Sequence, residues 1–420
     1  MRILFVTPQV PHPTQGGAAI RNWHLMQAAI TAGHTVHLIT PDLFREGMDG
    51  PAQALALPQY RRTFAHRLRD LVLSREPDLA RRLGARRLQA AIARRCRDSA
   101  YDVIQVEGLE IWPGIPRTDV PILYDAHNAE AILQGRMARQ AARDRRLFHA
   151  AYSAIQARKL RRYEAGIMCR AACTLAVSAA DAAHLRARAP NATVAIVPLG
   201  VDTAHYERRA DNLTPQPPLH CDGEGPGMRL SEGACTPSAP TVDVLFTATF
   251  DYRANEDAAD WFVMQVWPRI RRVRPGARCA FVGRNPGDKL RGWNGREGIT
   301  VTGNVPDDRP FMAAANVYIL PIRFGAGVRV KLLNAMSMGC AIVATPAACE
   351  GVDVVDGQQI VVAAPDPAIF AASVLSLLND PDRRAALGHA ARAFVAERYD
   401  WSVCTPTLLA IYATLERDNG

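Results

Sequence analysis

The feature that most constrains the fold of this chain is a regular alternation of short apolar runs with longer helical segments. Strands that alternate with helices build a largely parallel sheet, because each helix carries the chain back to the edge where the next strand starts. In the N-terminal half the apolar runs are RILFVT (2–7), HTVHLIT (34–40), YDVIQV (101–106), PILYDA (121–126), CTLAVS (173–178) and ATVAIVP (192–198). The sequence therefore predicts an α/β domain with a doubly wound sheet over residues 1–205.

The C-terminal half repeats this arrangement. Helices are expected after Asn255, Asp307 and Val328. Strands are expected at VDVLFTA (242–248), RCAFVG (278–283), ITVTG (299–303), VYILPI (317–322) and AIVAT (341–345). We therefore predict two Rossmann-like domains, the second over residues 242–385, with ligands beyond the carboxyl ends of the strands. A helical segment over 386–420 is expected to pack back toward the N-terminal domain.

Residues 206–241, between the two domains, differ from both in composition. Six prolines and four glycines lie between Asp211 and Thr241. Such a segment lacks the apolar residues needed to order itself against a core. We interpret it as an insertion or linker outside both cores.

The overall composition, 48% hydrophobic and 22% charged, is typical of a soluble globular protein. The N-terminus, MRILFVTPQV, lacks the features of a signal peptide, so we interpret it as a first strand and expect a cytoplasmic protein. The nine cysteines are scattered without a paired framework. No ligand set with the spacing of a zinc site stands out, so no metal is expected.

Residues 61–97 concentrate part of the net charge of +9. Twelve arginines face three carboxylates there, and apolar residues recur between them, a pattern typical of amphipathic helices with a cationic face. One partner that fits is an anionic membrane surface, which would make the protein peripheral on the inner face of the membrane. The alternative is that the arginines only keep the protein soluble. Nucleic acid is not expected, because the basic runs lack a recognised motif and interleaved aromatic residues.

The segment FGAGVRVKLLNAMSMGCAIVAT (324–345) places small residues and two cations at the start of a predicted helix. The amides at a helix N-terminus attract anions, and small residues let an anion approach the backbone. Gly325, Gly327, Arg329 and Lys331 therefore suggest a phosphate site. The alternative is that the glycines serve only the loop and that Lys331 is solvated.

Two further candidates follow predicted strands of the first domain. Gly16 and Gly17 lie between the first strand and the first helix, where a tight backbone can face a phosphate; a purely structural turn is the alternative. His127 follows a strand directly in YDAHN (124–128), and a histidine exchanges a proton near neutral pH. Asp125 and Asn128 are secondary candidates.

Taken together, these segments resemble the GT-B glycosyltransferases, and specifically family 4, which transfers sugars from nucleotide-sugar donors. The resemblance covers nearly the whole chain and implies two domains that face a central cleft, with the donor mostly on the C-terminal domain and the acceptor on the N-terminal one. It is carried by TQGGAAIRNWHLMQAAITAGHTVHLIT (14–40), YDAHN (124–128), VPLGVDT (197–203), DYRANEDAADWF (251–262), VTGNVPD (301–307) and GAGVRVKLLNAMSMGCAIVAT (325–345).

The resemblance also implies roles for individual residues. It makes His127 a contact to the reacting centre, and Lys331, Arg253 and Arg329 the candidates that offset charge on the leaving diphosphate. The turn at 303–305 is implied to meet the nucleobase through its main chain. The implied donor-binding residues are Gly16, Gly17, Gly303, Asn304, Val305, Gly325, Ala326, Gly327, Val328, Arg329 and Asn334.

Two positions depart from the family pattern. Ala326 and Asn334 stand where the family has a glutamate pair that binds hydroxyls of the sugar and the ribose. An asparagine still exchanges hydrogen bonds but lacks the charge of a carboxylate.

The function expected from the resemblance is transfer of a sugar from a nucleoside diphosphate sugar to a lipid-linked or saccharide hydroxyl. We expect retention of configuration, a role in polysaccharide or glycolipid biosynthesis, and no cofactor. A nucleotide-binding protein with degenerate activity and a nucleotide-sugar epimerase of the same fold stay open as alternatives.

Overall fold

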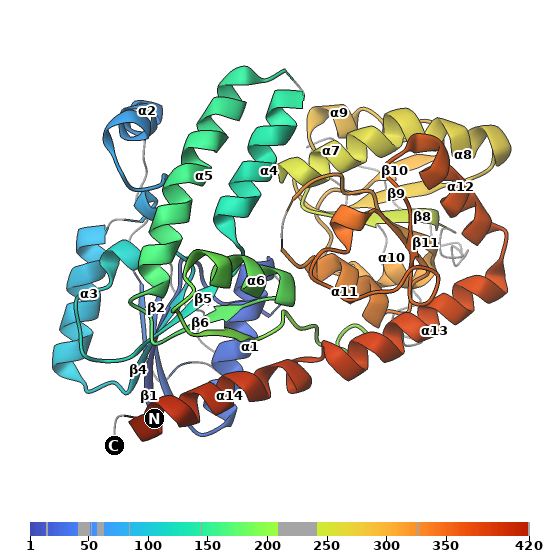
Figure 1. Ribbon diagram of the computed structural model, residues 1–420. Helices are drawn as coiled ribbons and strands as arrows, with labels where there is room; N and C mark the ends of the chain where they lie inside the picture. The colour runs from blue at the N-terminus through green and yellow to red at the C-terminus, as the bar shows by residue number, and fades with distance from the viewer. Residues whose placement is uncertain are drawn as a thin grey trace, which may run out of the picture.

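Figure 1 shows a computed structural model of the chain, made of two parallel sheets that are each flanked by helices. The structure describes residues 1–13, 16–40, 51, 53–56, 63–83, 85–143, 145–208, 242–325 and 327–418. Nearly all of the predicted insertion lies outside the described residues, as do Ala326 and part of the basic stretch at 61–97.

The N-terminal domain is built on a seven-stranded parallel sheet with the order β3-β2-β1-β4-β5-β6-β7. Its strands are β1 (Arg2–Val6), β2 (Thr35–Thr40), β3 (Gln53–Ala56), β4 (Val103–Glu107), β5 (Ile122–Ala126), β6 (Cys173–Ala176) and β7 (Val194–Ile196). The strand order reverses between β1 and β4. Ligands of such sheets bind beyond the carboxyl ends of the strands at this reversal.

Helices cover both faces of this sheet, and β1 shows why. Successive side chains on a strand point to opposite faces of the sheet. Ile3 and Phe5 face a core that includes α1 (Gly17–Thr31) and the C-terminal helix α14 (Trp401–Asp418). Leu4 and Val6 face a core that includes α3 (Ala85–Asp98) and α5 (Leu147–Met168). The helices of this domain are α1 (Gly17–Thr31), α2 (Phe64–Leu73), α3 (Ala85–Asp98), α4 (Glu130–Arg143), α5 (Leu147–Met168) and α6 (Ala179–Arg188).

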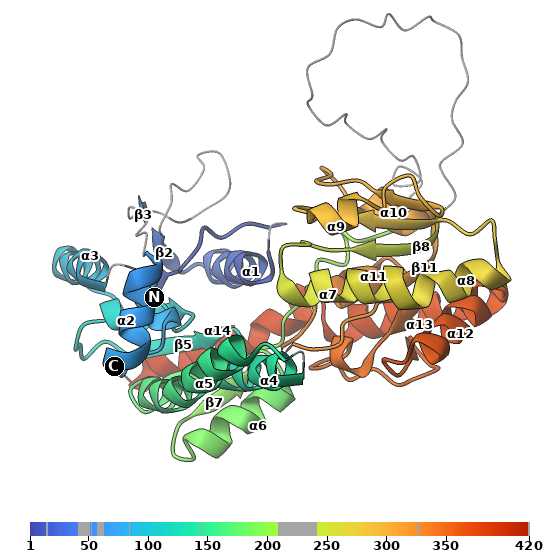
Figure 2. The same cartoon turned by 90° about the horizontal axis from the view of Figure 1, so that it is seen from above.

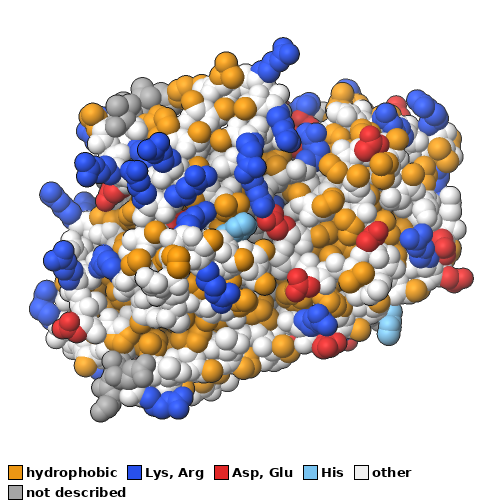
Figure 3. Space-filling model, viewed as in Figure 1, with side chains coloured by type: hydrophobic (Ala, Val, Ile, Leu, Met, Phe, Trp, Pro, Cys, Tyr) orange, Lys and Arg blue, Asp and Glu red, His pale blue; other side chains and the backbone are white. Residues whose placement is uncertain are grey.

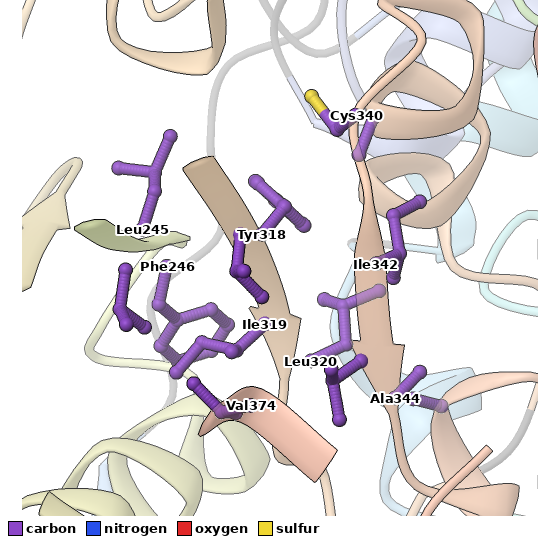
Figure 4. Packing of buried hydrophobic residues seen from close by; sticks show 14 of the residues in the cluster. Leu245, Phe246, Tyr318, Ile319, Leu320, Cys340, Ile342, Ala344 and Val374 are labelled. Carbon is purple, nitrogen blue, oxygen red and sulfur yellow. The ribbon is translucent and has the colours of Figure 1, made fainter. Parts of the chain in front are cut away.

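The C-terminal domain holds a six-stranded parallel sheet with the order β10-β9-β8-β11-β12-β13, which reverses between β8 and β11. The strands of this sheet are β8 (Val242–Thr247), β9 (Cys279–Val282), β10 (Ile299–Val301), β11 (Ala315–Leu320), β12 (Ile342–Ala344) and β13 (Val361–Val362). The helices of this domain are α7 (Arg253–Trp261), α8 (Trp267–Val273), α9 (Asp288–Arg291), α10 (Arg309–Ala314), α11 (Val330–Ser337) and α12 (Pro367–Leu378). Figure 4 shows side chains from β8, β11 and β12 packed together with Val374 of α12.

The last two helices, α13 (Pro381–Arg398) and α14 (Trp401–Asp418), lie on different domains. Figures 1 and 2 show α13 along the C-terminal domain, where it contacts α11, and α14 along the N-terminal domain, where it contacts α1. Between them the carbonyl of Tyr399 accepts a hydrogen bond from the amide of Val201 at 2.8 Å. The chain therefore crosses between the domains twice, and the two crossings lie side by side.

The predicted fold class is confirmed, since both halves form Rossmann-like parallel sheets. Every predicted apolar run contains a strand, and α7, α10 and α11 begin close to the expected positions. β3 and β13 were not predicted; both are short strands at the edges of their sheets. Among the helices that the structure describes, none has the length and apolar character needed to cross a bilayer.

We expect Gly388→Ala to destabilise the protein, because α13 packs closely on the turn after α11. A Cβ on Gly388 would lie 2.1 Å from the carbonyl oxygen of Gly339, so α13 would have to shift away. Overpacking of this kind costs roughly 1–3 kcal/mol in free energy of unfolding, which chemical denaturation measures. The matched control is Gly166→Ala in α5, where nothing lies within 4 Å of the added Cβ. This control should keep or raise stability, and equal losses in both variants would contradict the close packing.

Candidate active site

The loops that follow the strands of the two sheets meet at the domain boundary. Gly17, at the start of α1, lies against Val330, at the start of α11, since a Cβ on Gly17 would be 3.1 Å from Val330 Cγ2. Gly327 approaches Asn128 so closely that a Cβ there would lie 2.0 Å from Asn128 Oδ1. Each of these loops follows the carboxyl end of a strand. The ligand-binding edges of the two sheets therefore face each other.

His127, directly after β5, is held by a buried carboxylate. Its Nε2 lies 3.0 Å from Oε2 of Glu107, the last residue of β4. Gln105, on the same face of β4, donates to the other oxygen of Glu107 at 2.6 Å. Asn22 of α1, with its amide nitrogen turned toward this network, donates to Glu107 Oε2 at 2.9 Å. The imidazole is thus fixed through Nε2, and Nδ1 lies on the side of Gly108.

A buried ion pair lies next to this network, since Asp125 Oδ2 is 3.8 Å from His127 Nε2. Arg21 of α1 binds Asp125 of β5 with two nitrogens, Nε to Oδ2 at 2.6 Å and Nη2 to Oδ1 at 3.0 Å, and both side chains are almost completely buried. Its Nη1 donates to the carbonyls of Val197 and Pro198 at 2.9 and 3.1 Å. Arg21 therefore fixes α1, β5 and the segment that leaves the domain in one arrangement.

The surroundings change the acidity of His127 and of the two carboxyl groups next to it. Burial and the charge of Asp125 raise the pKa of Glu107 to about 7. Burial also opposes ionisation of Asp125, but the Arg21 guanidinium outweighs it and the pKa of Asp125 is lowered. Burial disfavours the charged form of His127, yet the hydrogen bond to Glu107 and the charge of Asp125 raise its pKa on balance. Glu107 and His127 therefore hold an exchangeable proton near neutral pH.

The same three side chains raise the question of a metal ion, although none is expected from the sequence. Ligating atoms of Glu107, Asp125 and His127 lie within 4.8 Å of one another. However, the carboxylate of Asp125 is bound by the Arg21 guanidinium, and a buried positive charge there opposes a second cation. The arrangement fits a hydrogen-bond network around His127 better than a metal site.

His127 lines a cavity of about 350 Å³ in the N-terminal domain. Arg82 and the carboxylates of Glu110 and Glu130 also line it. Burial and the charge of Glu110 raise the pKa of Glu130 to about 7, and Asn128 donates to Glu130 at 3.2 Å. A carboxyl group that is partly protonated at neutral pH both donates and accepts hydrogen bonds. The cavity therefore suits a ligand that carries hydroxyl groups.

On the other side of the boundary, the loop before α11 is shaped by two glycines. Gly325 and Gly327 have φ angles of 143° and 79°, which side-chain-bearing residues rarely adopt. Arg329, at the N-cap of α11, folds back over Gly325, since a Cβ there would lie 2.0 Å from Arg329 Nη2. Arg136 of α4 donates to the carbonyl of Gly325 at 2.9 Å. The loop is thus tied to the N-terminal domain, and the first amides of α11 follow it.

Lys331 lies in the first turn of α11 and is partly buried. Its Nζ donates to Oδ1 of Asn255 at 3.1 Å and lies 5.2 Å from the centre of the Phe246 ring. Burial and the charge of Arg329 lower the pKa of Lys331 to about 7, while Asp308 opposes this shift. A bound anion would restore the positive charge of such a lysine. The start of α11 therefore fits a phosphate group.

The other predicted donor residues that the structure describes in the C-terminal domain lie in its loops and helices. Arg253 is the first residue of α7, two positions before Asn255. Gly303, with a φ of 73°, follows β10 and is followed by Asn304 and Val305. Val328 packs against apolar residues of both domains. Asn334 is buried on α11, one turn beyond Lys331.

Several residues of these sites were not predicted from the sequence, among them Arg21, Glu107, Asn255 and Asp308. A signal existed for Arg21 and Glu107, because a charged residue among apolar neighbours in a helix or strand needs a buried partner. Asn255 and Asp308 gave no such signal. Their contacts depend on how α7 and the loop after β10 pack against α11.

Two family models match the chain, one for each domain. The model described as Glycosyltransferase Family 4 matches residues 15–205, and the model described as Glycosyl transferases group 1 matches residues 241–380. With the two facing Rossmann-like domains, these matches define a glycosyltransferase of the GT-B class. The chain belongs to family 4, the group 1 glycosyltransferases.

Individual relatives are more distant. The phosphatidyl-myo-inositol mannosyltransferase of Mycobacterium tuberculosis is 29% identical over 184 residues, which cover 41% of this chain and 47% of that protein. The match thus spans about half the length of this relative.

Two solved structures resemble the chain over nearly its full length. The sucrose-phosphate synthase of Thermosynechococcus elongatus has a TM-score of 0.72 at 18% identity, covering 99% of this chain and 98% of that one. Anabaena HepE in complex with UDP and glucose has a TM-score of 0.64 at 14% identity, covering 98% and 99%. At these identities the likeness shows the shared fold.

The low pKa of Lys331 predicts a pH-dependent affinity for nucleotide sugars. Below about pH 7 the lysine is charged with or without ligand, so the affinity should be constant. Above about pH 7 the free lysine is neutral and binding must take up a proton. The affinity should therefore fall there, by at most about tenfold per pH unit. Lys331→Met should lose about 1.5–3 kcal/mol of binding free energy at neutral pH and abolish this pH dependence. Titration calorimetry with nucleotide sugars, whose diphosphate stays ionised over this range, measures both effects.

Two controls belong to this measurement. Lys289→Met removes an exposed lysine of α9 that pairs with Asp260 and should change neither affinity nor pH dependence. The free nucleoside should bind Lys331→Met as it binds the natural protein. Undiminished binding of the nucleotide sugar by Lys331→Met would exclude the start of α11 as the phosphate site.

Proposed function

We propose that this chain is an enzyme that transfers a hexosyl group from a nucleoside diphosphate sugar to a hydroxyl group of a lipid-linked or saccharide acceptor. The nucleotide binds the C-terminal domain, with its base at the 303–305 turn and its diphosphate beside Lys331. The acceptor binds the N-terminal domain in the cavity beside His127. The donor itself carries the activated sugar, so the proposal requires no cofactor.

The observation that carries this proposal is the close approach of the His127 loop to the start of α11. Asn128, next to His127, touches Gly327, and Gly17 touches Val330. A diphosphate held beside Lys331 would therefore place its attached sugar near His127 and the acceptor cavity. Such positioning of two reactants is a main source of rate enhancement in enzymes.

In the proposed reaction the bond between the anomeric carbon and the diphosphate oxygen breaks. The acceptor oxygen bonds to that carbon, the nucleoside diphosphate leaves with the electron pair of the broken bond, and the hydroxyl proton of the acceptor passes to water. Lys331, Arg329, Arg253 and the first amides of α11 offset the charge that develops on the diphosphate. His127 contacts the transferred sugar through Nδ1, because Glu107 holds Nε2. Retention of configuration is part of the proposal and rests on the resemblance to the family.

We also propose that the acceptor is presented at an anionic membrane surface, consistent with a role in glycolipid or polysaccharide biosynthesis. A second cavity, of about 530 Å³, shares Leu83 with the cavity beside His127. More arginines than carboxylates line it: Arg69, Arg81, Arg86 and Arg87 against Asp70 and Glu76. Figure 3 shows Lys and Arg side chains gathered over the N-terminal domain, and the mycobacterial relative is named for a lipid acceptor. Arginines of this kind fit phosphate-bearing lipid headgroups.

Asn334 favours a second candidate function, a nucleotide-binding protein with little turnover. Its buried side chain offers hydrogen bonds without the charge that the family uses to bind hydroxyls. The two functions differ in one observable. A transferase turns over a bound nucleotide sugar when an acceptor is supplied, whereas a binding protein does not.

His127→Ala should lower kcat by about 10²- to 10³-fold, the usual effect of removing one polar contact to the reacting centre, while leaving nucleotide affinity nearly unchanged. The reason is that the nucleotide is held by the other domain. Steady-state kinetics and calorimetry on the same preparation separate the two quantities. His389→Ala, which removes an exposed histidine of α13, is the control. If kcat stayed within twofold of the natural protein, His127 would have no part in the reaction.

A further inference from the structure

A continuous set of buried hydrogen bonds connects the C-terminal helix to His127. The hydroxyl of Tyr412, on α14, donates to Oε1 of Gln105. Gln105 Nε2 donates to Glu107 Oε1 at 2.6 Å, and Glu107 Oε2 lies 3.0 Å from His127 Nε2. Tyr412, Gln105 and Glu107 are completely buried. Bulk water therefore has no direct access to replace a lost bond in this set.

The Tyr412 hydroxyl determines which end of the Gln105 amide faces Glu107. An amide presents an acceptor oxygen on one side and a donor nitrogen on the other. Burial raises the pKa of Tyr412 well above its ordinary value, so the hydroxyl keeps its proton, and in the structure it donates that proton to Gln105 Oε1. With its oxygen bound to Tyr412, Gln105 must turn its nitrogen to Glu107. That donated hydrogen bond stabilises the charged form of the carboxylate.

We propose that Tyr412 is a positioning residue for His127, acting through Gln105 and Glu107. Its hydroxyl orients the Gln105 amide, the amide holds Glu107 as a carboxylate, and the carboxylate fixes the imidazole and favours its protonated form. Tyr412 itself touches neither donor nor acceptor. Its effect on catalysis rests on the proposed function, whereas its effect on the acidity of His127 does not.

Several charged groups surround His127. The proposal concerns only the hydrogen bonds that connect Tyr412 to His127 through Gln105 and Glu107. Glu107 approaches from β4, Asp125 from β5 and Arg21 from α1. From α14, Cys404 lies near Arg21, and burial raises the pKa of its thiol to about 12, so it is neutral. Removing the Tyr412 hydroxyl leaves these groups in place. The Gln105 amide would then no longer be held with its nitrogen toward Glu107. Without that donated hydrogen bond the pKa of Glu107 would rise further, and the pKa of His127 would fall because its neighbouring carboxylate is less often charged.

The test is Tyr412→Phe, which removes the hydroxyl and keeps the ring. The control is Tyr318→Phe, which removes an equally buried hydroxyl that lies 2.7 Å from Thr247 Oγ1 in the C-terminal domain. An NMR titration of the His127 imidazole, assigned with His127→Gln, reports its pKa without any substrate. We expect this pKa to fall in Tyr412→Phe and to stay unchanged in Tyr318→Phe. An unchanged pKa in both variants would overturn the proposal, whether or not the protein proves to be a transferase.

Kinetics extend the test to catalysis. In Tyr412→Phe, kcat should fall by roughly tenfold with an unchanged KM for the donor. The limb of the kcat–pH profile that follows the ionisation of Glu107 should move to higher pH. The route is checked in a Gln105→Met background, where Tyr412→Phe should have no further effect on the His127 pKa. An undiminished effect there would show that Tyr412 acts by another path and would overturn the proposed route. A lower melting temperature, with no shift in the NMR titration of His127 or in the kcat–pH profile, would show that Tyr412 contributes only to packing.

Discussion

The buried ion pair between Arg21 and Asp125 is the interaction on which the rest of the site depends. It joins α1 to β5 and, through the carbonyls of Val197 and Pro198, to the segment that leaves the N-terminal domain. Losing one partner of such a pair typically costs about 3–5 kcal/mol, because the other charge stays buried without compensation. The pair also lowers the pKa of Asp125, which leaves Glu107 as the carboxyl group that exchanges a proton with His127. One interaction thus fixes both the direction of α1 and the chemistry beside β5.

The two sides of the domain boundary carry ionisable groups of opposite charge, acidic on the N-terminal side and basic on the C-terminal side. The N-terminal side presents Glu107 and Glu130, whose pKa values are raised by burial and neighbouring carboxyl groups, and the C-terminal side presents Lys331, whose pKa is lowered by burial and Arg329. Burial destabilises the charged form of each of these groups. Glu107 has its partners within the protein, whereas Glu130 lines the cavity beside His127 and Lys331 lies at the start of α11, where a ligand would supply a partner. Groups of this kind concentrate at functional sites. A hydroxyl-bearing acceptor on one side and an anionic donor on the other would satisfy both sets.

The sequence predicted the fold well because apolar runs and helix starts are local signals. The runs at 2–7 and 317–322 contain β1 and β11, and a helix begins just after Arg329, as the small residues and cations before it indicated. The site was predicted only in part. His127 and Lys331 follow recognisable motifs, but their partners Glu107 and Asn255 come from distant segments, and pairing between distant segments leaves no periodicity in a single sequence. β13 has two residues at a sheet edge and gave no pattern at all.

The central claim is that a nucleoside diphosphate binds at the start of α11 with its distal phosphate toward His127. The most direct test is a crystal structure of the chain with the tightest-binding nucleoside diphosphate from a panel of bases. We predict a phosphate oxygen within about 3 Å of Lys331 Nζ or of the first main-chain amides of α11. A diphosphate bound elsewhere, with the start of α11 free of ligand, would contradict it.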